Sequence, residues 1–266
     1  MRAPILIDDP DDPRVADYIG VRERDLVGRD GRFIAEGEVV IDVALARGAF
    51  PLRSVLVARP KAAGLAGLLD RVPATVPVYA AEPRVMDAVT GFHIHRGLLA
   101  VGARGPERDA GALLDGLSDH AVVIGLVGIT NHDNVGGIFR NAAAFGADAV
   151  LVDGATCDPL YRKAIRVSVG ASLMVPFARV ADPGAMLDML ERRGFEAIAL
   201  SPGGAQSVAE MVAPRRAALL LGAEGPGLPD HVLARAQGVR IDMAPGFDSL
   251  NVATASGIAL HRIVPF

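Results

Sequence analysis

Three glycine-rich segments combine backbone amides with polar side chains that could bind an anion or support group transfer. They span Asn131–Ala147, Leu221–Leu228 and Asp248–Gly257, and each follows a short apolar run. Open α/β sheets bind their ligands at the carboxyl ends of parallel strands, where such turns occur. We therefore expect the three segments to form one site in the second half of the chain.

The first segment has two readings. Gly136 and Gly137 are predicted to lie at a strand-to-helix turn that approaches a ligand closely, with Arg140 and Asn141 in the first helical turns. The forked donors of an arginine suit a phosphate or a developing oxyanion. Ordinary helix-start chemistry, with Asn134 as the cap and Arg140 on a solvated face, explains the same residues equally well. This segment alone leaves both readings open.

The other two segments also place polar side chains among flexible backbone. The glycines of the second segment follow a strand, but their spacing is not G-x-G-x-x-G, so the resemblance to a dinucleotide fingerprint is weak. Glu224 stands among them and could accept hydrogen bonds from a ligand or from loop amides. Ser249 and Asn251 precede the last predicted helix, which either could cap. The coincidence of three such turns on one sheet favours a shared pocket.

Strands and helices alternate along the chain, which predicts an α/β fold with a mostly parallel sheet in its second half. In the first block, up to about Arg104, we expect strands at Phe33–Gly37, Val55–Ala58, Val76–Ala80 and Gly97–Ala103 and helices at Glu38–Arg47 and Pro83–Val89. In the second we expect strands at Ala121–Val127, Ala149–Val152, Pro176–Val180, Ala197–Leu200, Ala217–Leu221 and Val239–Met243, and helices at Val135–Phe145, Leu160–Val169, Pro183–Arg193, Pro229–Ala236 and Val252–Ile263. Residues 1–104 and 119–266 are predicted domains, with a linker at 105–118 that could include one helical turn.

Composition limits the function classes. The chain has 266 residues, of which 51% are hydrophobic, so a disordered or fibrous protein is excluded. Cys157 is the only cysteine, which excludes an internal disulfide and a multi-cysteine metal site and fits a reducing interior. The sequence shows no signal peptide and no apolar run near the ~20 residues of a membrane span, so we expect a cytoplasmic soluble protein.

A nucleic-acid partner would need local basic surfaces, because the formal net charge is -4. Solvated helix faces explain the basic clusters as well as RNA contact does. A histidine pair two residues apart lacks further metal ligands, which favours a structural or RNA-stacking role. The small side chains of Val252–Ile263 predict tight packing against its own domain or a second subunit. The basic clusters are Arg22, Arg24, Arg29 and Arg32, and Arg162, Lys163 and Arg166; the histidines are His93 and His95.

The three segments read N-x-x-N-V-G-G-I-F-R-N-A-x-A-F-G-A, L-G-A-E-G-x-G-L and D-S-L-N-V-A-x-A-x-G-I-A-L. In order and character they resemble the three motifs of the SpoU/TrmH-type RNA ribose 2′-O-methyltransferases of the SPOUT superfamily. F-I-A-E-G-E near residue 33 and H-R-G-L-L-A near residue 95 resemble the small α/β substrate-binding domain, similar to a ribosomal-protein fold, that often precedes the catalytic domain. The resemblance implies a C-terminal parallel-sheet domain with a trefoil knot.

The resemblance also implies roles for individual residues. S-adenosylmethionine would lie bent in the knotted loops, and two subunits would pair so that each active site forms at the dimer interface, without a metal. The implied substrate is ribosomal or transfer RNA. Arg140 matches the arginine that activates the ribose 2′-hydroxyl and Asn134 its support, while Glu224, Ser249 and Asn251 match the polar residues of the other motifs. The implied cofactor positions are Gly222, Ile241 and Leu250, with Leu200 or Ser201 flanking the adenosine.

Two departures from the family pattern concern loop stiffness. His132-Asp133 replaces the proline that commonly precedes the first-motif asparagine, and the I-P-M run reads Ile241-Asp242-Met243. These changes bear on cofactor affinity more than on the type of reaction. The alternative function is a catalytically inactive RNA-binding knot protein in ribosome assembly, against which the intact polar residues argue. A nicotinamide dehydrogenase is a distant third because the fingerprint is missing.

Overall fold

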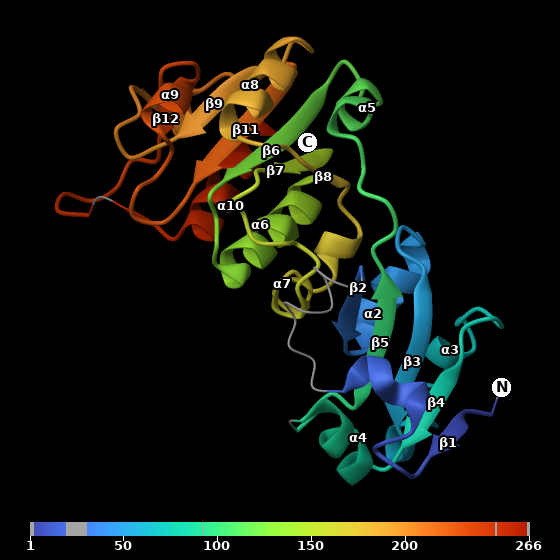
Figure 1. Cartoon of the computed structure of the whole chain (residues 1–266). Coiled ribbons are helices and arrows are strands. Elements are labelled where there is room, and N and C mark those ends of the chain that lie inside the picture. Colours follow the sequence, from blue (N-terminus) through green and yellow to red (C-terminus); the bar gives the residue numbers. More distant parts are fainter. Residues whose placement is uncertain (1–2, 20–30, 92, 248, 265–266) are drawn as a thin grey trace. The chain divides into compact units, whose positions relative to one another are not determined.

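The computed structural model describes residues 3–19, 31–91, 93–247 and 249–264, which form two compact units (Figure 1). Met1–Gly105 and Leu160–Met174 form the first unit. Pro106–Pro159 and Val175–Phe266 form the second. No described helix is long and apolar enough to cross a membrane.

The first unit is built on a mixed sheet of five strands, in the order β1, β4, β3, β5, β2. β4 pairs in parallel with β1 and β3, whereas β5 is antiparallel to β2 and β3. A hydrophobic core that includes the fully buried Tyr18 and Leu56 lies against this sheet. The strands are β1 (Ile5–Ile7), β2 (Arg32–Glu36), β3 (Leu52–Ala58), β4 (Val78–Ala81) and β5 (Leu98–Ala103).

Short helices connect these strands. The first long one, α2, begins at Glu38 and ends where Gly48 adopts a left-handed conformation with φ 60°, a stop that the sequence predicted. The segment at 160–174 belongs to this unit because its helix α7 contacts β2. The helical elements are η1 (Pro13–Tyr18), α2 (Glu38–Arg47), η2 (Arg59–Lys61), α3 (Ala66–Leu69), α4 (Pro83–Thr90), α7 (Arg162–Val167) and η3 (Ala171–Leu173).

The second unit contains the predicted parallel sheet, with seven strands in the order β10, β12, β9, β11, β6, β7, β8. Every pairing between neighbouring strands is parallel. All seven residues of β6 are buried, as its continuous apolar sequence indicates for a central strand covered on both faces. The strands are β6 (Ala121–Val127), β7 (Ala149–Val152), β8 (Phe177–Arg179), β9 (Glu196–Leu200), β10 (Gln206–Ser207), β11 (Arg216–Gly222) and β12 (Gln237–Arg240).

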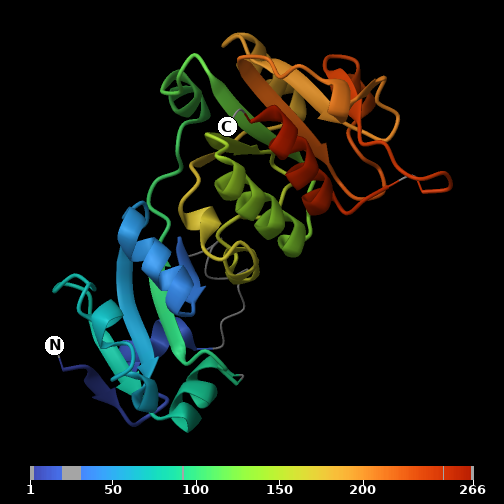
Figure 2. The same cartoon turned by 180° about the vertical axis from the view of Figure 1, so that it is seen from behind.

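Helices cover both faces of this sheet. Figure 2 shows α6 and α10 side by side on one face. On the other face, α5, α8 and α9 pack into a core with the central strands. The helices are α5 (Ala110–Asp115), α6 (His132–Phe145), α8 (Pro183–Glu191), α9 (Asp230–Leu233) and α10 (Val252–Ile263), with a 3₁₀ turn η4 (Val208–Glu210).

The structure differs from the sequence predictions at several points. Gly136 and Gly137 lie inside α6 and not at a strand-to-helix turn, because Asn131 caps the helix and starts it earlier. The one helical turn expected in the linker 105–118 is present as α5, but its Leu114 is fully buried in the core of the second unit. The strand expected at Val239–Met243 ends at Arg240. β1 and β10 were not predicted.

Candidate active site

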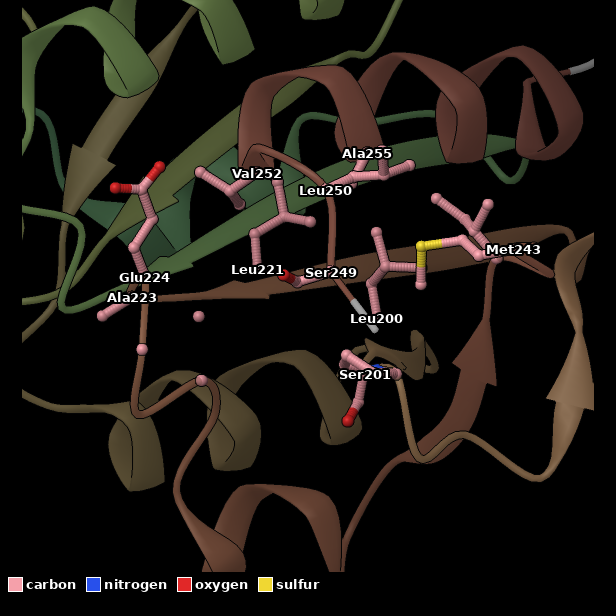
Figure 3. Close-up of a pocket in the computed structure, with 15 residues that line it drawn as sticks. Leu200, Ser201, Leu221, Ala223, Glu224, Met243, Ser249, Leu250, Val252 and Ala255 are labelled. Atoms are coloured by element: carbon pink, nitrogen blue, oxygen red, sulfur yellow. The ribbon is translucent and has the colours of Figure 1, made fainter. Parts of the chain in front are cut away.

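The second and third glycine-rich segments line one pocket at the carboxyl ends of β9 and β11, beside the loop that follows β12, and the first segment is not part of this lining. Its walls are mostly apolar, and Glu224 is the one charged residue among its described lining residues. Figure 3 shows Glu224 toward one end of the lining and Leu200 and Met243 toward the other. The lining residues are Leu200, Ser201, Pro202, Leu221, Gly222, Ala223, Glu224, Gly225, Gly227, Ile241, Met243, Ser249, Leu250, Val252 and Ala255.

The second segment folds back on itself so tightly that only glycine fits at its start. A Cβ on Gly222 would lie 2.3 Å from the carbonyl carbon of Gly227 and 2.4 Å from the amide nitrogen of Leu228. Gly225 and Gly227 have φ values of 86° and 71°, which glycine adopts without strain. At these glycines the loop therefore presents its backbone to the pocket, whereas Glu224 between them presents a side chain.

A hydrogen-bonded cluster of polar side chains joins the three segments. Asn134 donates through Nδ2 to Glu224 Oε1 over 2.8 Å. Asn251 donates through Nδ2 to Asn134 Oδ1 over 2.8 Å and to Glu224 Oε1 over 3.1 Å. The first, second and third segments are thus linked by one contact network, which we call the Asn–Glu–Asn cluster.

Helix ends hold the two asparagines of this cluster. Asn251 caps α10, its Oδ1 accepting from the amides of Ala253 and Thr254 over 3.0 and 3.3 Å. Asn134 lies within the first turn of α6 and is only 3% exposed. The cap of that helix is Asn131, and not Asn134. Burial and capping fix both side chains, and this favours a preorganised site.

A buried carboxylate fixes the chain just before α6. Asp153 follows β7 and is 4% exposed. Both of its carboxylate oxygens accept from the Gly128 amide over 3.1 Å, and Oδ1 also accepts from the Thr156 amide over 2.8 Å. Gly128 has a φ of 66°, so the chain turns sharply on leaving β6. Sequence reasoning missed Asp153, because nothing in its local pattern distinguishes it from a surface loop residue.

Arg140 stands apart from the pocket. It is exposed on α6, and it is absent from the pocket lining. Within the described residues its side chain makes no hydrogen bond or ion pair. The structure therefore brings together Asn134, Glu224 and Asn251, with Ser249 in the adjacent lining, but it does not bring Arg140 of the same chain to them.

All five residues predicted for the cofactor line the pocket, namely Leu200, Ser201, Gly222, Ile241 and Leu250. The sequence analysis did not single out several other lining side chains. Met243 belongs to the loop whose departure from the family pattern had been noted, and Leu221 ends β11. Val252 and Ala255 belong to the first turn of α10. The small side chains of that helix, which predict close packing, were the one sequence signal that could have pointed to these two residues.

The predicted basic clusters are partly committed to ion pairs. Arg32 pairs with Asp17, and Arg162 donates to the buried Glu36 over 2.6 Å, so neither is a free surface cation. Arg166 is exposed. Arg22, Arg24 and Arg29 lie outside the described residues.

The histidine pair lies in the first unit. The rings of His93 and His95 form an edge contact with centroids 4.6 Å apart. His93 Nδ1 lies 2.7 Å from Asp87 Oδ2, and this hydrogen bond lowers the pKa of the Asp87 carboxyl. Among the described residues no group of three or more His, Cys, Asp or Glu side chains could hold a metal ion.

The pocket suits the chemistry of S-adenosylmethionine. Apolar side chains from Leu200, Ile241 and Leu250 can enclose an adenosine. Glu224 lies in the same lining, where an acidic group would interact favourably with a cofactor that carries a positively charged sulfonium. The residues present therefore fit this cofactor.

Comparisons with known proteins agree with this geometry. The SpoU rRNA Methylase family model matches residues 121–261. A protein of Mycobacterium tuberculosis named an uncharacterized tRNA/rRNA methyltransferase is 42% identical over 264 residues, covering 96% of this chain and 89% of that protein. The 23S rRNA (guanosine-2′-O-)-methyltransferase RlmB of Pseudomonas putida is 31% identical over 199 residues, covering 71% of this chain and 77% of its own.

A solved structure is similar over nearly the whole chain as well. The SpoU methyltransferase AviRb from Streptomyces viridochromogenes, determined in complex with AdoMet, aligns with a TM-score of 0.79 and 26% sequence identity. The alignment covers 94% of this chain and 96% of AviRb. The sequence motifs, the pocket and the relatives thus lead to one conclusion: the chain belongs to the SpoU rRNA methylase family of S-adenosylmethionine-dependent RNA ribose methyltransferases.

Proposed function

We propose that the protein transfers a methyl group from S-adenosylmethionine to the 2′-hydroxyl of a ribose in ribosomal or transfer RNA. The observation that carries this proposal is the Asn–Glu–Asn cluster beside the apolar pocket, since it joins the three motif segments by hydrogen bonds of 2.8 to 3.1 Å. An apolar pocket alone would suit many ligands. An apolar pocket with a preorganised polar edge suits a methyl donor on one side and a hydroxyl on the other.

The cofactor supplies an electrophilic methyl on a sulfonium, and the protein must make the weakly acidic hydroxyl a better nucleophile. An arginine, with a pKa above ~12, is a poor general base. We therefore assign Arg140 the stabilisation of the developing alkoxide together with a contact to a neighbouring phosphate, while the hydroxyl proton is released to solvent water. Asn134, Glu224 and Asn251 hold the polar edge in place, and Ser249 lies beside it in the lining.

We propose a homodimer in which Arg140 of the partner subunit completes each site. Two observations support this assembly. Arg140 is exposed and is not among the residues of its own chain's pocket. Two apolar side chains near the pocket and on α10, Leu250 and Ile258, are 43% and 40% exposed, which suits an interface. We also propose, from the family resemblance, that the segment ending in α10 is threaded as a trefoil knot.

We propose that the first unit, which includes Leu160–Met174 as well as the N-terminal block, binds the RNA and that the second unit carries the methyltransferase site. Exposed basic side chains gather around the loops that follow β3 and β4 and precede β5. Lys61 links two of these loops, its Nζ donating to the carbonyls of His95 and Arg96 over 2.9 and 3.1 Å. Such a local surface can bind phosphates despite the acidic total charge. Its members are Arg59, Lys61, Arg84, His93, His95 and Arg96.

The function is tested by incubating the protein and labelled S-adenosylmethionine with total RNA from a strain that lacks it, then mapping 2′-O-methyl sites. Arg140→Ala should abolish methylation while leaving the calorimetric affinity for the cofactor unchanged, and Arg192→Ala, on an exposed position after α8, serves as the control. Retained methylation by Arg140→Ala contradicts the assignment. Failure of the wild-type protein to bind the cofactor favours the inactive RNA-binding alternative.

A further inference from the structure

In the loop after β12, successive side chains point in turn to the pocket and to polar groups outside it. Ile241 and Met243 line the pocket, whereas Asp242 between them does not. Figure 3 shows Met243 near Leu200, which ends β9 on the adjoining wall. The side chain of Asp242 is 57% exposed, so it serves neither the core nor the ligand cavity directly.

Asp242 instead holds this loop to its neighbours through two partners. The hydroxyl of Ser207, in β10, donates to Asp242 Oδ2. Arg240 Nε donates to Asp242 Oδ1 over 3.0 Å. Ser207 is only 3% exposed, so its hydroxyl has a fixed position from which to act. We call this arrangement the Ser–Asp–Arg bracket.

The same bracket reaches the wall that follows β9. Arg240 Nη1 donates to the carbonyls of Gly204 and Ala205 over 3.1 and 2.7 Å. Gly204 packs so closely on β12 that a Cβ would lie 2.3 Å from the carbonyl carbon of Val239. The Ser201 amide in turn donates to Val239 O over 2.9 Å. Hydrogen bonds therefore join the loop that follows β9 to the end of β12, outside the part of the pocket where we expect the adenosine.

The charges of the bracket are complementary. The hydrogen bond from Ser207 and the charge of Arg240 lower the pKa of the Asp242 carboxyl below its ordinary value, so the aspartate is ionised at neutral pH. Unlike the proline of the family pattern, an aspartate does not fix φ, so its backbone alone does not stiffen the loop. Side-chain contacts must therefore supply the stiffness.

We propose that Asp242 is a positioning residue for the cofactor: through Ser207 and Arg240 it holds Ile241 and Met243 in the shape that binds the adenosine half of S-adenosylmethionine. This inference uses the family's cofactor but not the identity of the RNA or the reacting hydroxyl. Asp242 touches no reacting atom, and its effect falls on cofactor affinity.

The test is isothermal titration calorimetry of S-adenosylmethionine with the full chain. Asp242→Ala should raise the Kd about tenfold, which corresponds to about 1.4 kcal/mol. Ser207→Ala should act in the same direction, and Ser207→Ala with Asp242→Ala should weaken binding no more than Asp242→Ala alone, because both changes break one network. Asp242→Asn keeps an acceptor for Ser207 but loses the charge, so its Kd should be intermediate, and it replaces the alanine variant if that variant does not fold.

A matched control separates positioning from general surface electrostatics. Asp115 is also an exposed aspartate paired with an arginine, Arg193, over 2.7 Å, and it does not line the pocket. Asp115→Ala should leave the Kd for the cofactor unchanged. In steady-state assays Asp242→Ala should raise KM for the cofactor and leave KM for RNA unchanged, whereas a general loss of structure would raise both.

Three results would overturn the proposal. A wild-type Kd in both Asp242→Ala and Asp242→Asn removes the role of the bracket. An equal loss of cofactor affinity in Asp115→Ala would also remove it. A rise in KM for RNA that parallels the rise in KM for the cofactor in Asp242→Ala would have the same meaning. Absence of cofactor binding by the wild-type protein would also refute the proposed function, whereas the three results above refute the role of Asp242 alone.

Discussion

Replacement of Gly137 by alanine tests the close approach of α6 and α10. A Cβ on Gly137 would lie 2.7 Å from the Cβ of Ala253. Carbon atoms in contact are about 3.5–4.0 Å apart, so the two helices must separate by about 1 Å. Overpacking of this kind costs about 1–3 kcal/mol, of which the better helix propensity of alanine returns about 1 kcal/mol. Gly137→Ala should therefore destabilise the second unit by about 0–2 kcal/mol.

The larger and clearer signal is the coupling between the two positions. In a background with Ala253→Gly the clash is absent, so Gly137→Ala should there stabilise the protein by about 1 kcal/mol through helix propensity alone. The change of sign gives a coupling of about 1–3 kcal/mol in a double-mutant cycle. Denaturant unfolding of the four proteins measures it.

The same cycle reports on the site. Asn134 on α6 and Asn251 at the cap of α10 are joined over 2.8 Å, a distance that a separation of about 1 Å breaks. Gly137→Ala should lower turnover about tenfold or more, and Ala253→Gly in the same chain should restore it. Additive stabilities, or turnover that stays at the wild-type level in Gly137→Ala, would refute the view that this contact sets the spacing of the two asparagines.

Three further predictions concern the pocket and its surroundings. Gly222→Ala should abolish calorimetric binding of S-adenosylmethionine, because its Cβ meets the backbone of Gly227 at 2.3 Å; normal binding would mean that the loop can open without cost. Glu224→Ala removes the acceptor shared by two asparagine amides and should lower turnover about tenfold to a hundredfold. Glu224→Gln keeps an acceptor oxygen and should lose less turnover. An equal loss in both variants would mean that the charge of Glu224, and not its role as an acceptor, is what matters. Burial raises the pKa of the Cys157 thiol from 9.0 to about 11, so at pH 8 iodoacetamide should alkylate it about a hundredfold more slowly than a cysteine in a peptide, and a peptide-like rate measured by mass spectrometry would contradict this burial.

Predictions from the sequence succeeded where one local signal determines the structure. The continuous apolar run of Ala121–Val127 is the central strand β6, and Gly48 ends α2 as predicted. The five positions that the family resemblance implies for the cofactor all line one pocket, because each ends or follows a strand of the same parallel sheet or precedes α10; their role in binding the cofactor stays a prediction.

Predictions failed where distant residues decide. One local signal was also missed, since Asn131 caps α6 and starts it at His132, which leaves both glycines inside the helix with Gly137 against α10. β12 ends at Arg240, where Asp242 turns to Ser207, a residue 35 positions away. No local pattern marks such pairs. Arg162 was likewise predicted to be a surface cation, whereas the fold places Glu36, a residue distant in the sequence, beside it as an ion-pair partner.

The segment Leu160–Met174 has a consequence for dividing the protein. It lies between β7 and β8 in the chain, yet it packs within the first unit, so three peptide connections pass between the units and not one. A fragment that begins at residue 119 would carry this segment without the sheet that covers it, exposing Ala164 and Ile165 and leaving Arg162 without its carboxylate. The C-terminal part of the chain is therefore not expected to fold independently. A catalytic fragment made by truncation should aggregate unless Leu160–Met174 is also redesigned.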